Sequence, residues 1–436
     1  MTYAEAVGRL LALRGGEYAG MRPGLERVHE LLAALGHPET RYDLLQVGGT
    51  NGKGSVSAMV AAMLKASGRR VGLYTSPHLV SFRERIRVNG EAISEDSVVD
   101  GMEAIGTLVA RLDATVFEAT TVLALDHFAR EGVDVAVLEV GLGGRVDATT
   151  VGAPLASVVT RIDLDHEAYL GTTLEQIARE KAAIIRSGRA FVAAQAPEAA
   201  SVLLARAIET GVPLEREGHE LHVDLVRRSL SGQRIMCAGP DWRMPDLDVA
   251  LVGSYQPANV LLAVAAARTL GTDEAAVRAG LSRVHWPGRF DVLGDDPWLV
   301  LDGAHNPGGA RALARSLNDH FAGMPVTFVV GLLRDKDQRG ILAELMPLAD
   351  RVVVTRPSSP RGADPETLAG MVSSMGVRVE IAASAAEALA LAARPPRPPV
   401  ICVAGSLVLI GDVLRLYQGD IPCPVEKPAA SMKPRG

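Results

Sequence analysis

The sequence predicts an α/β protein with two sheets. The first is an N-terminal, doubly wound, mostly parallel sheet of the phosphate-loop type, and the second belongs to a smaller, Rossmann-like C-terminal domain. An apolar run at residues 44–47 is followed by a glycine-rich turn, and apolar residues then recur at helical spacing over 56–64. From residue 298 onward, five short apolar segments alternate with helical patterns, which is typical of parallel strands joined by helices.

Length and local composition predict how the chain divides. A chain of 436 residues is too long for a single core and is expected to form more than one domain. We expect a first domain over residues 1–284, a linker over 285–288, a second domain over 289–420 and a mobile, proline-rich tail over 421–436. Short alternating strands over 217–252 predict a small β-rich flap on the first domain.

Composition and charge argue against several classes of protein. Hydrophobic residues make up 48% and charged residues 22% of the chain, as in ordinary globular proteins. The net charge of −6 gives no reason to expect a nucleic-acid partner. The sequence shows neither the order of a signal peptide nor a run long enough to span a membrane. Cys237, Cys402 and Cys423 have neither paired nor metal-binding spacing, so we expect a cytoplasmic protein without a membrane partner.

The turn after the first strand predicts a phosphate site. It reads Gly48-Gly49-Thr50-Asn51-Gly52-Lys53-Gly54-Ser55 and lies between the carboxyl end of a strand and the amino end of a helix. Backbone N–H groups and the helix dipole favour an anion there, and Lys53 can reach the terminal phosphates. The spacing differs from the standard P-loop because Gly54 separates Lys53 from Ser55. The alternative is a tight turn without a ligand.

Three further strands, expected at residues 71–74, 133–140 and 155–160, lead into polar residues on the ligand side of such a sheet. Ser76 follows the first of them, where it either contacts a ligand or caps a turn. Glu139 lies near the end of the second, where a buried carboxylate needs a compensating charge. Magnesium beside a nucleotide would supply it, and the alternative is a salt bridge to Arg145. His166, after the third, is a candidate second metal or phosphate contact.

One lysine is predicted to face the protein interior. Lys181 lies in a helix expected over residues 173–186 and falls on the same apolar stripe as Ile177. Burial disfavours the charged amine and lowers its pKa. A neutral amine can react with carbon dioxide to give a carbamate, an anionic ligand for a metal or phosphate site. The alternative is a lysine that reaches outward to pair with Glu180 or Glu139.

The second half of the chain adds polar residues near helix starts. Asn259 lies near the start of a helix that opens at Pro257, where it can cap the helix or contact a base. The strands of the second sheet are expected at residues 298–302, 325–331, 351–355, 377–381 and 399–404. The first leads into Asp302 and His305, and the last into Ser406, at the sheet edge where ligands bind.

Together these motifs resemble one family, the dihydrofolate synthase/folylpolyglutamate synthase enzymes of the Mur ligase superfamily. The matching segments, in the family's order, are residues 49–55, 76–78, 139–149, 165–166, 180–182, 287–290, 302–307 and 335–337. The glycine after Lys53 is this family's own form of the loop. The resemblance extends from about residue 24 to residue 406, and it implies a Mur-type ATP-binding domain followed by a Mur-type C-terminal domain.

The resemblance implies an ATP-dependent, ADP-forming ligase that joins L-glutamate to dihydropteroate and to reduced folates through an acyl phosphate. The implied cofactors are ATP, two magnesium ions and a monovalent cation such as K⁺, and the implied state is a monomer. The residues agree, because phosphoryl transfer needs positioning and charge neutralisation rather than a protein nucleophile. The alternatives are folylpolyglutamate synthase activity alone, another amino-acid ligase of the superfamily, and a P-loop GTPase-like regulator or kinase.

Roles for single residues also follow from the resemblance. The implied ATP contacts are Thr50, Asn51, Gly52, Lys53, Gly54, Ser55, Asn259, Arg289 and Asp302. The implied magnesium ligands are Ser76, Glu139 and His166, and the implied catalytic residues are Lys53, Glu139, His166, Lys181 and His305. The implied substrate contacts are Arg22, Thr115, Val116, Phe117, Glu118, Val146, Asp147, Ala148 and Ser406.

Two details refine this picture. Lys181 matches the family's carbamylated lysine, but Ala183 stands where the family usually has glycine, which raises the question of whether its methyl group crowds the carbamate. Members of the family also differ in whether they add the first glutamate, later ones or both. The match of the substrate pocket, notably Asp147, favours both activities.

Overall fold

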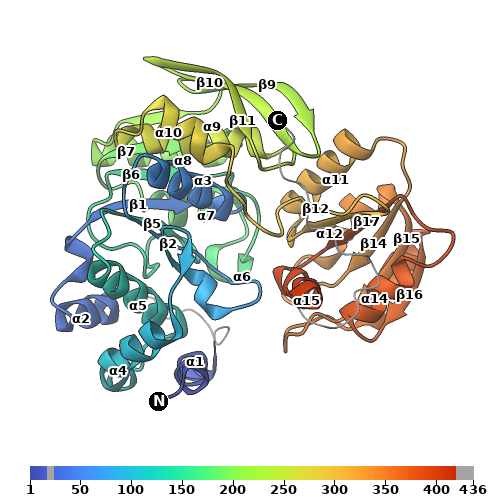
Figure 1. Cartoon of the computed structure of the whole chain (residues 1–436), viewed down its shortest axis with the longest axis horizontal. Coiled ribbons are helices and arrows are strands. Elements are labelled where there is room, and N and C mark those ends of the chain that lie inside the picture. The colour runs from blue at the N-terminus through green and yellow to red at the C-terminus, as the bar shows by residue number, and fades with distance from the viewer. Residues whose placement is uncertain (17–23, 419–436) are drawn as a thin grey trace. The chain divides into compact units, whose positions relative to one another are not determined.

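The computed structural model describes residues 1–16 and 24–418, and forms two compact units. The first unit contains Met1–Arg227, Arg234–Ala250 and Pro257–Val284, and the second contains Arg228–Gln233, Leu251–Gln256 and the chain from His285 onward (Figure 1). The predicted contact at Arg22 and the predicted tail over 421–436 lie outside the described residues. Within the described ranges, no helix is long and apolar enough to cross a membrane.

The first unit is built on an eight-stranded sheet in the order β4-β3-β2-β5-β1-β6-β7-β8. Its strands are β1 (Asp43–Gly48), β2 (Val71–Tyr74), β3 (Ile86–Val88), β4 (Glu91–Ala92), β5 (Val135–Glu139), β6 (Ala156–Val159), β7 (Arg189–Val192) and β8 (Leu214–Arg216). β1 pairs in parallel with β5 on one side and β6 on the other, and the antiparallel pairs of this sheet are β2–β3 and β3–β4. The predicted mostly parallel sheet is confirmed.

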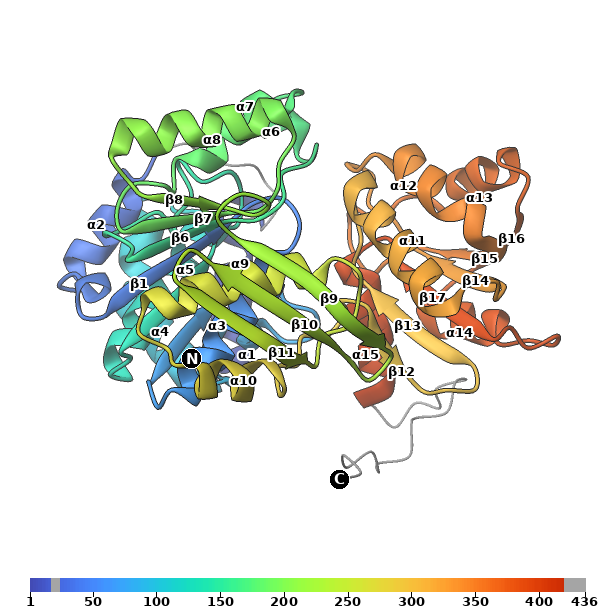
Figure 2. The same cartoon turned by 90° about the horizontal axis from the view of Figure 1, so that it is seen from above.

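Helices cover both faces of this sheet. The α-helices of the first unit are α1 (Tyr3–Leu11), α2 (Glu26–Ala34), α3 (Lys53–Ala66), α4 (Glu95–Arg111), α5 (Val116–Arg130), α6 (Glu167–Leu170), α7 (Leu174–Ala182), α8 (Pro197–Thr210), α9 (Gln256–Thr269) and α10 (Glu274–Leu281). Figure 2 shows α7 and α8 on one side of the sheet and α3, α9 and α10 on the other. α10 packs closely on α3 at Gly280, where a Cβ would lie 2.6 Å from the backbone of Met63.

The short helical turns are η1 (Leu13–Gly15), η2 (Pro38–Thr40), η3 (Phe82–Arg85) and, in the second unit, η4 (Met346–Leu348). The predicted flap is a three-stranded sheet in the order β11-β10-β9, with β9 at His222–Ser229, β10 at Gly232–Gly239 and β11 at Trp242–Val249. It is prominent in Figure 2. The tip between β9 and β10 belongs to the second unit, so the flap is shared between the units along the chain.

The second unit contains a six-stranded sheet in the order β12-β13-β17-β14-β15-β16. Its strands are β12 (Asp291–Leu293), β13 (Trp298–Asp302), β14 (Val326–Val330), β15 (Ala349–Thr355), β16 (Arg378–Ala382) and β17 (Val400–Ala404), and its α-helices are α11 (Pro307–Phe321), α12 (Gln338–Leu345), α13 (Pro365–Ser374), α14 (Ala385–Ala392) and α15 (Leu407–Gln418). All five predicted strands are present. β12, which we did not predict, pairs antiparallel with β13 at the edge of the sheet.

The helix that carries Lys181 ends earlier than predicted. We expected it to reach residue 186, but α7 ends at Ala182. The backbone N–H of Ile185 bonds to the carbonyl of Ala182 at 2.9 Å, three residues back, so the helix tightens and stops. The hydroxyl of Ser157, on β6, then donates to the carbonyl of Ile184 at 2.7 Å. The apolar spacing of Ile184 and Ile185 therefore reflects burial beyond the helix rather than its continuation.

Candidate active site

The glycine-rich turn has the backbone that a phosphate loop needs. Gly49 and Gly52 have φ angles of 129° and 99°, which favour glycine, and Gly52 caps α3. A Cβ on Gly49 would lie 2.0 Å from Thr160 Oγ1, and one on Gly52 would lie 2.5 Å from Asn259 Oδ1. The structure therefore brings the buried Asn259 directly against the loop.

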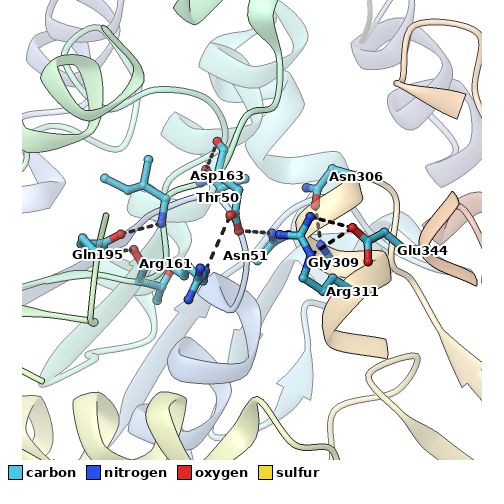
Figure 3. Close-up of polar contacts among 11 residues, drawn as sticks. Thr50, Asn51, Arg161, Asp163, Gln195, Asn306, Gly309, Arg311 and Glu344 are labelled. Atoms are coloured by element: carbon cyan, nitrogen blue, oxygen red, sulfur yellow. Dashed lines mark hydrogen bonds and ion pairs between the residues drawn. The ribbon is translucent and has the colours of Figure 1, made fainter. Parts of the chain in front are cut away.

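The loop is fixed to the segment that follows β6, as Figure 3 shows. The amides of Thr50 and Asn51 donate to the carbonyl of Arg161 at 2.9 and 3.2 Å. Asn51 Nδ2 donates to Asp163 Oδ2 at 3.0 Å, and Thr50 Oγ1 both donates to the carbonyl and accepts from the amide of Asp163 at 3.1 Å. The side chains of Thr50 and Asn51 thus hold the loop in shape.

Lys53 begins α3, and its Nζ donates to the carbonyl of Thr50 at 3.1 Å. Gly54 and Ser55 follow it in the first turn, whose N–H groups have no acceptor within the helix. An anion at this point would meet those N–H groups, the positive end of the helix and the Lys53 ammonium. The geometry fits the predicted phosphate site.

Lys181 is buried beside the phosphate loop. Only 4% of the residue is exposed, and its Nζ donates to the carbonyl of Gly49 at 2.8 Å. Burial, together with repulsion from Lys53, lowers the pKa of Lys181 to about 7, while the acids Asp165, Asp147 and Glu180 oppose the shift. The alternative of a lysine reaching outward is wrong, because the amine lies inside the protein.

Two neighbours of Lys181, Glu180 and Ala183, show how the end of α7 is held. Arg145 Nε lies 3.0 Å from Glu180 Oε1, so Arg145 pairs with Glu180 at the end of α7. Ala183 caps α7 with φ −61° and ψ −18°, a right-handed conformation open to any residue. Glycine is therefore not required at this position by the backbone.

The predicted metal ligands Ser76 and Glu139 lie together at the ends of β2 and β5. The amide of Ser76 donates to Glu139 Oε2 at 3.2 Å, and Glu139 is only 5% exposed. His166 has a left-handed backbone (φ 53°), and its Nε2 lies 3.9 Å from Asp165 Oδ1. A hydroxyl and a buried carboxylate are oxygen donors of the kind that magnesium prefers, and magnesium needs few protein ligands.

The predicted substrate residues on α5 have structural partners. Thr115 and Glu118 form a reciprocal cap at the start of the helix, and Arg27 donates to both oxygens of the Glu118 carboxylate, the shortest bond being 2.7 Å. Val116 is buried next to them. The ring of Phe117 lies against Gly141, where a Cβ would be 2.4 Å from its Cζ. Phe117 thus meets the loop that carries the other predicted substrate residues.

That loop holds Val146, Asp147 and Ala148, of which Asp147 and Ala148 are buried and Val146 is half-buried. One oxygen of Asp147 accepts from the amides of Gly141 and Leu142 at 3.0 and 2.9 Å. The other accepts from the amide and the hydroxyl of Thr149. Burial raises the pKa of Asp147 even though these donors favour its charged form.

The second unit contains the remaining predicted residues. Asp302 is buried at the end of β13 and accepts from Tyr255 Oη and from the amides of Phe290 and Ala304, each at 2.9 Å. Burial raises the pKa of Asp302, and the nearby Arg289 guanidinium opposes that shift. A Cβ on Gly303 would lie 2.6 Å from Arg289 Nη1.

Two further predicted residues flank this point in the second unit. His305 Nδ1 bonds to the carbonyl of Gly303 at 2.8 Å, which fixes the ring. Ser406 is buried after β17, and its Oγ accepts from the amide of Leu409 at 3.1 Å at the start of α15. β13 and β17 are adjacent parallel strands, so Asp302, His305 and Ser406 lie at one edge of the sheet, as predicted.

Sequence reasoning missed several residues that shape the site. The buried Gln46 and Thr149 form a network with the half-buried Arg186 beneath the 146–148 loop, and Tyr255 positions Asp302. A glutamine inside an otherwise apolar strand was a visible signal at Gln46. The partners of all four lie far away in the sequence, so the bonds themselves were not predictable from local patterns.

Comparisons with known proteins agree with this geometry. Residues 47–267 match the model of the Mur ligase middle domain, and residues 288–407 match the Mur ligase, glutamate ligase domain. The chain is 39% identical over 375 residues to the dihydrofolate synthase/folylpolyglutamate synthase of Mycobacterium tuberculosis, a match that covers 80% of this chain and 77% of that protein.

A longer relative and a solved structure extend the comparison. The chain is 39% identical over 424 residues to a probable bifunctional folylpolyglutamate synthase/dihydropteroate synthase of Haloferax volcanii; the match covers 94% of this chain but spans only half of that relative. The structure of Escherichia coli FolC in complex with DHPP and ADP superimposes with a TM-score of 0.88 at 32% identity, over 96% of this chain and 98% of that one. The chain therefore belongs to the dihydrofolate synthase/folylpolyglutamate synthase family of Mur ligases.

Proposed function

We propose that this chain is an ATP-dependent, ADP-forming ligase that adds L-glutamate to dihydropteroate and to folyl(poly)glutamates, with two magnesium ions and a monovalent cation such as K⁺ as cofactors. The observation that carries the proposal is Lys181 Nζ, buried 2.8 Å from the carbonyl of Gly49 in the phosphate loop. A simple nucleotide-binding module has no need of a buried amine at that point. A carbamate-forming ligase of this family does.

The buried amine fits a carbamate. Because its pKa is about 7, a large share of Lys181 is neutral near pH 7 and can add to carbon dioxide with release of one proton. Lys53, whose positive charge acts against the Lys181 ammonium, would instead attract the carbamate. The modification would therefore turn an unfavourable pair of cations into an ion pair beside the phosphates.

The chain's residues would then serve phosphoryl transfer and amide formation. The carboxylate of the acid substrate attacks the γ-phosphate, the bond to ADP breaks, and an acyl phosphate forms. The deprotonated amino group of glutamate adds to the acyl carbon, and phosphate leaves as the amide forms. Lys53 and the amino end of α3 would hold the phosphates throughout. Bound magnesium, with Ser76, Glu139 and His166 as its protein ligands, would neutralise charge that develops on the phosphates.

Other residues have supporting roles in this proposal. Residues 115–118 and 146–148 would form the pocket of the acid substrate. Asn259, Arg289 and Asp302 would contact ATP. His305 and Ser406 would help to place glutamate. The division into an ATP-binding domain over 1–284, a linker over 285–288 and a C-terminal domain over 289–420 is part of the same proposal.

The test is ADP release by the purified chain with ATP, magnesium and L-glutamate, with dihydropteroate and a tetrahydrofolate monoglutamate supplied separately. We expect turnover with both acceptors, dependence on glutamate, and loss of turnover in Lys53→Met. Turnover with the folate alone would leave folylpolyglutamate synthase as the function. If the chain binds ATP but releases no ADP with either acceptor, the proposal is contradicted and another acid substrate of the superfamily is favoured.

A further inference from the structure

The connection between β5 and β6 is unusual, because it crosses the sheet without a helix. β5 and β6 lie on either side of β1 and run parallel to it, so residues 140–155 must return along one face of the sheet. They pass over β1, since a Cβ on Gly152 would lie 2.6 Å from Leu44 Cδ1 and the Gln46 side chain on β1 donates to Thr149 and Thr150 of the connection. A helix usually makes such a return and satisfies its own backbone. The irregular return is buried over residues 147–149, and its polar groups there need partners from elsewhere.

Gln46 supplies partners on one side. It lies on β1, only 1% exposed, and its Nε2 donates to Thr149 Oγ1 at 3.0 Å and to Thr150 Oγ1 at 2.9 Å. Thr149 Oγ1 in turn donates to Asp147 Oδ1, and Thr150 Oγ1 donates to the carbonyl of Gly144 at 2.7 Å. Each hydroxyl thus accepts one bond and donates one, so the direction of every bond is determined.

Arg186 supplies partners on the other side. Its Nη1 donates to Gln46 Oε1, its Nη2 to the carbonyl of Val151 at 2.8 Å, and its Nε to the carbonyl of Gly152 at 3.2 Å. The guanidinium therefore fixes which way the Gln46 amide points, with its oxygen toward Arg186 and its nitrogen toward the threonines. The Asp147 carboxylate completes the chain of bonds with its four acceptor positions all occupied by the loop.

The same connection also packs on the end of α7. The amide of Arg145 donates to the carbonyl of Glu180 at 3.0 Å, and a Cβ on Gly144 would lie 2.7 Å from that oxygen and 3.3 Å from the carbonyl of Lys181. β1 leads directly into Gly49, which accepts the Lys181 amine. Three segments of the candidate site therefore meet around Gln46: the phosphate loop, the helix end with Lys181, and the 146–148 loop.

We infer that Arg186, Gln46 and Thr149 form a positioning relay that holds the 146–148 loop, and with it the acid substrate, in register with the phosphate loop. This role rests on the proposed function. The three side chains are positioning residues, because they act on the substrate through Asp147 and the backbone of the loop. In-line attack needs the carboxylate within about 3–3.5 Å of the γ-phosphate, and a shift of about 1 Å can cost about a hundredfold in rate.

Thr149 offers a matched pair of substitutions. Thr149→Val keeps the shape of the side chain but removes the hydroxyl that links Gln46 to Asp147, whereas Thr149→Ser keeps that hydroxyl. We expect Thr149→Val to raise the KM for dihydropteroate and to lower kcat, each by about tenfold, with the KM for ATP unchanged within about twofold. Thr149→Ser should restore most of both. Gln46→Glu, which still accepts from Arg186 but has no amide N–H to donate, should resemble Thr149→Val.

The control is Thr272→Val, which removes another buried hydroxyl of the first unit, one that has no hydrogen-bond partner among the residues described. It should leave all three parameters as in the wild type. Equal kinetics for Thr149→Val and Thr272→Val would overturn the relay. The relay would also be overturned if Thr149→Val and Gln46→Glu lower the melting temperature but leave the KM for dihydropteroate unchanged. Such a result would indicate a purely structural role.

A second measurement separates the relay from the proposed reaction. Hydrogen exchange at the amides of Gly141 and Leu142, which bond to Asp147, should be faster in Thr149→Val than in the wild type and near normal in Thr149→Ser. If the wild type releases no ADP with either acceptor, the proposed function is rejected, and so is the effect of the relay on the acid substrate. Unchanged exchange in an active Thr149→Val enzyme would reject the relay while leaving the proposed function intact.

Discussion

Replacing Lys181 by methionine should stabilise the protein at neutral pH while abolishing ligation. Lys181 is fully enclosed, and burial together with repulsion from Lys53 lowers its pKa from 10.5 to about 7. The unfolded chain keeps the ordinary value, so folding at pH 7 or below must either desolvate a charged amine or remove its proton. Methionine fills a similar volume without a charge.

The expected size follows from the shift in pKa. At 1.36 kcal/mol per pKa unit, the cost of burying Lys181 is about 5 kcal/mol below pH 7. The carbonyl of Gly49 loses its hydrogen bond in the variant, which costs about 1–3 kcal/mol. The net gain should therefore be about 2–4 kcal/mol at pH 6.

The sign of the pH dependence is also determined. Between pH 7 and about 10 the unfolded lysine binds a proton that the folded lysine does not, so the stability of the wild type rises with pH. The advantage of Lys181→Met should shrink by about 1.4 kcal/mol per pH unit over this range and vanish before pH 10. The assay is urea unfolding followed by far-ultraviolet circular dichroism, at several pH values and in buffers freed of carbon dioxide.

The control is Lys65→Met, at an exposed lysine of α3, which should change the free energy of unfolding by less than about 0.5 kcal/mol. A Lys181→Met variant that is less stable than the wild type at pH 6 would refute the reasoning. A stability difference that stays constant from pH 6 to pH 10 would refute it equally, because it would show that the Lys181 amine does not titrate on folding.

Two further predictions concern the phosphate loop and the substrate pocket. Gly52→Ala should abolish ADP binding measured by calorimetry, because its Cβ would lie 2.5 Å from Asn259 and its φ of 99° is strained for alanine. The control is Gly106→Ala, in the middle of α4, where a Cβ meets no atom within 4 Å. That variant should bind ADP normally, and its free energy of unfolding should rise by about 0.5–1 kcal/mol. Arg27→Met should lower the free energy of unfolding in urea by about 3–5 kcal/mol, because it leaves the buried Glu118 carboxylate without its bidentate partner. A further Glu118→Gln substitution should recover part of that loss. A loss below about 1 kcal/mol would show that the pair contributes no more than a surface contact.

Features encoded by neighbouring residues were predictable from the sequence. The strand, turn and helix around Lys53 follow from an apolar run, glycines and helical spacing, all within about twenty residues. The burial of Lys181 followed from its place on the stripe of α7, and the strands of the second sheet from their apolar runs. In each case the signal and the structure it predicts occupy the same stretch of chain.

Features that depend on distant partners were not predictable. The early end of α7 depends on Ser157, which takes up the carbonyl of Ile184 from another strand. The Gln46 side chain bonds to residues more than a hundred positions away, and no local pattern indicates which of the many later threonines it meets. The share of the flap tip in the second unit is likewise invisible in the sequence, because it depends on which surface the tip packs against.

The interleaving of the two units limits how relatives can exchange parts. The core of the second unit includes Val252, with Leu230 packed against it, and Arg228 pairs with Asp319 at 2.7 Å. In a chimera joined at residue 284, the chain after residue 284 would come from one parent, whereas Arg228, Leu230 and Val252, which pack against it, would come from the other. Grafting a C-terminal domain between family members should therefore preserve its packing only if residues 228–233 and 251–256 come from the same parent, whereas residues 234–250 stay with the first unit. The practical unit of recombination is therefore discontinuous and extends beyond the matched glutamate ligase domain.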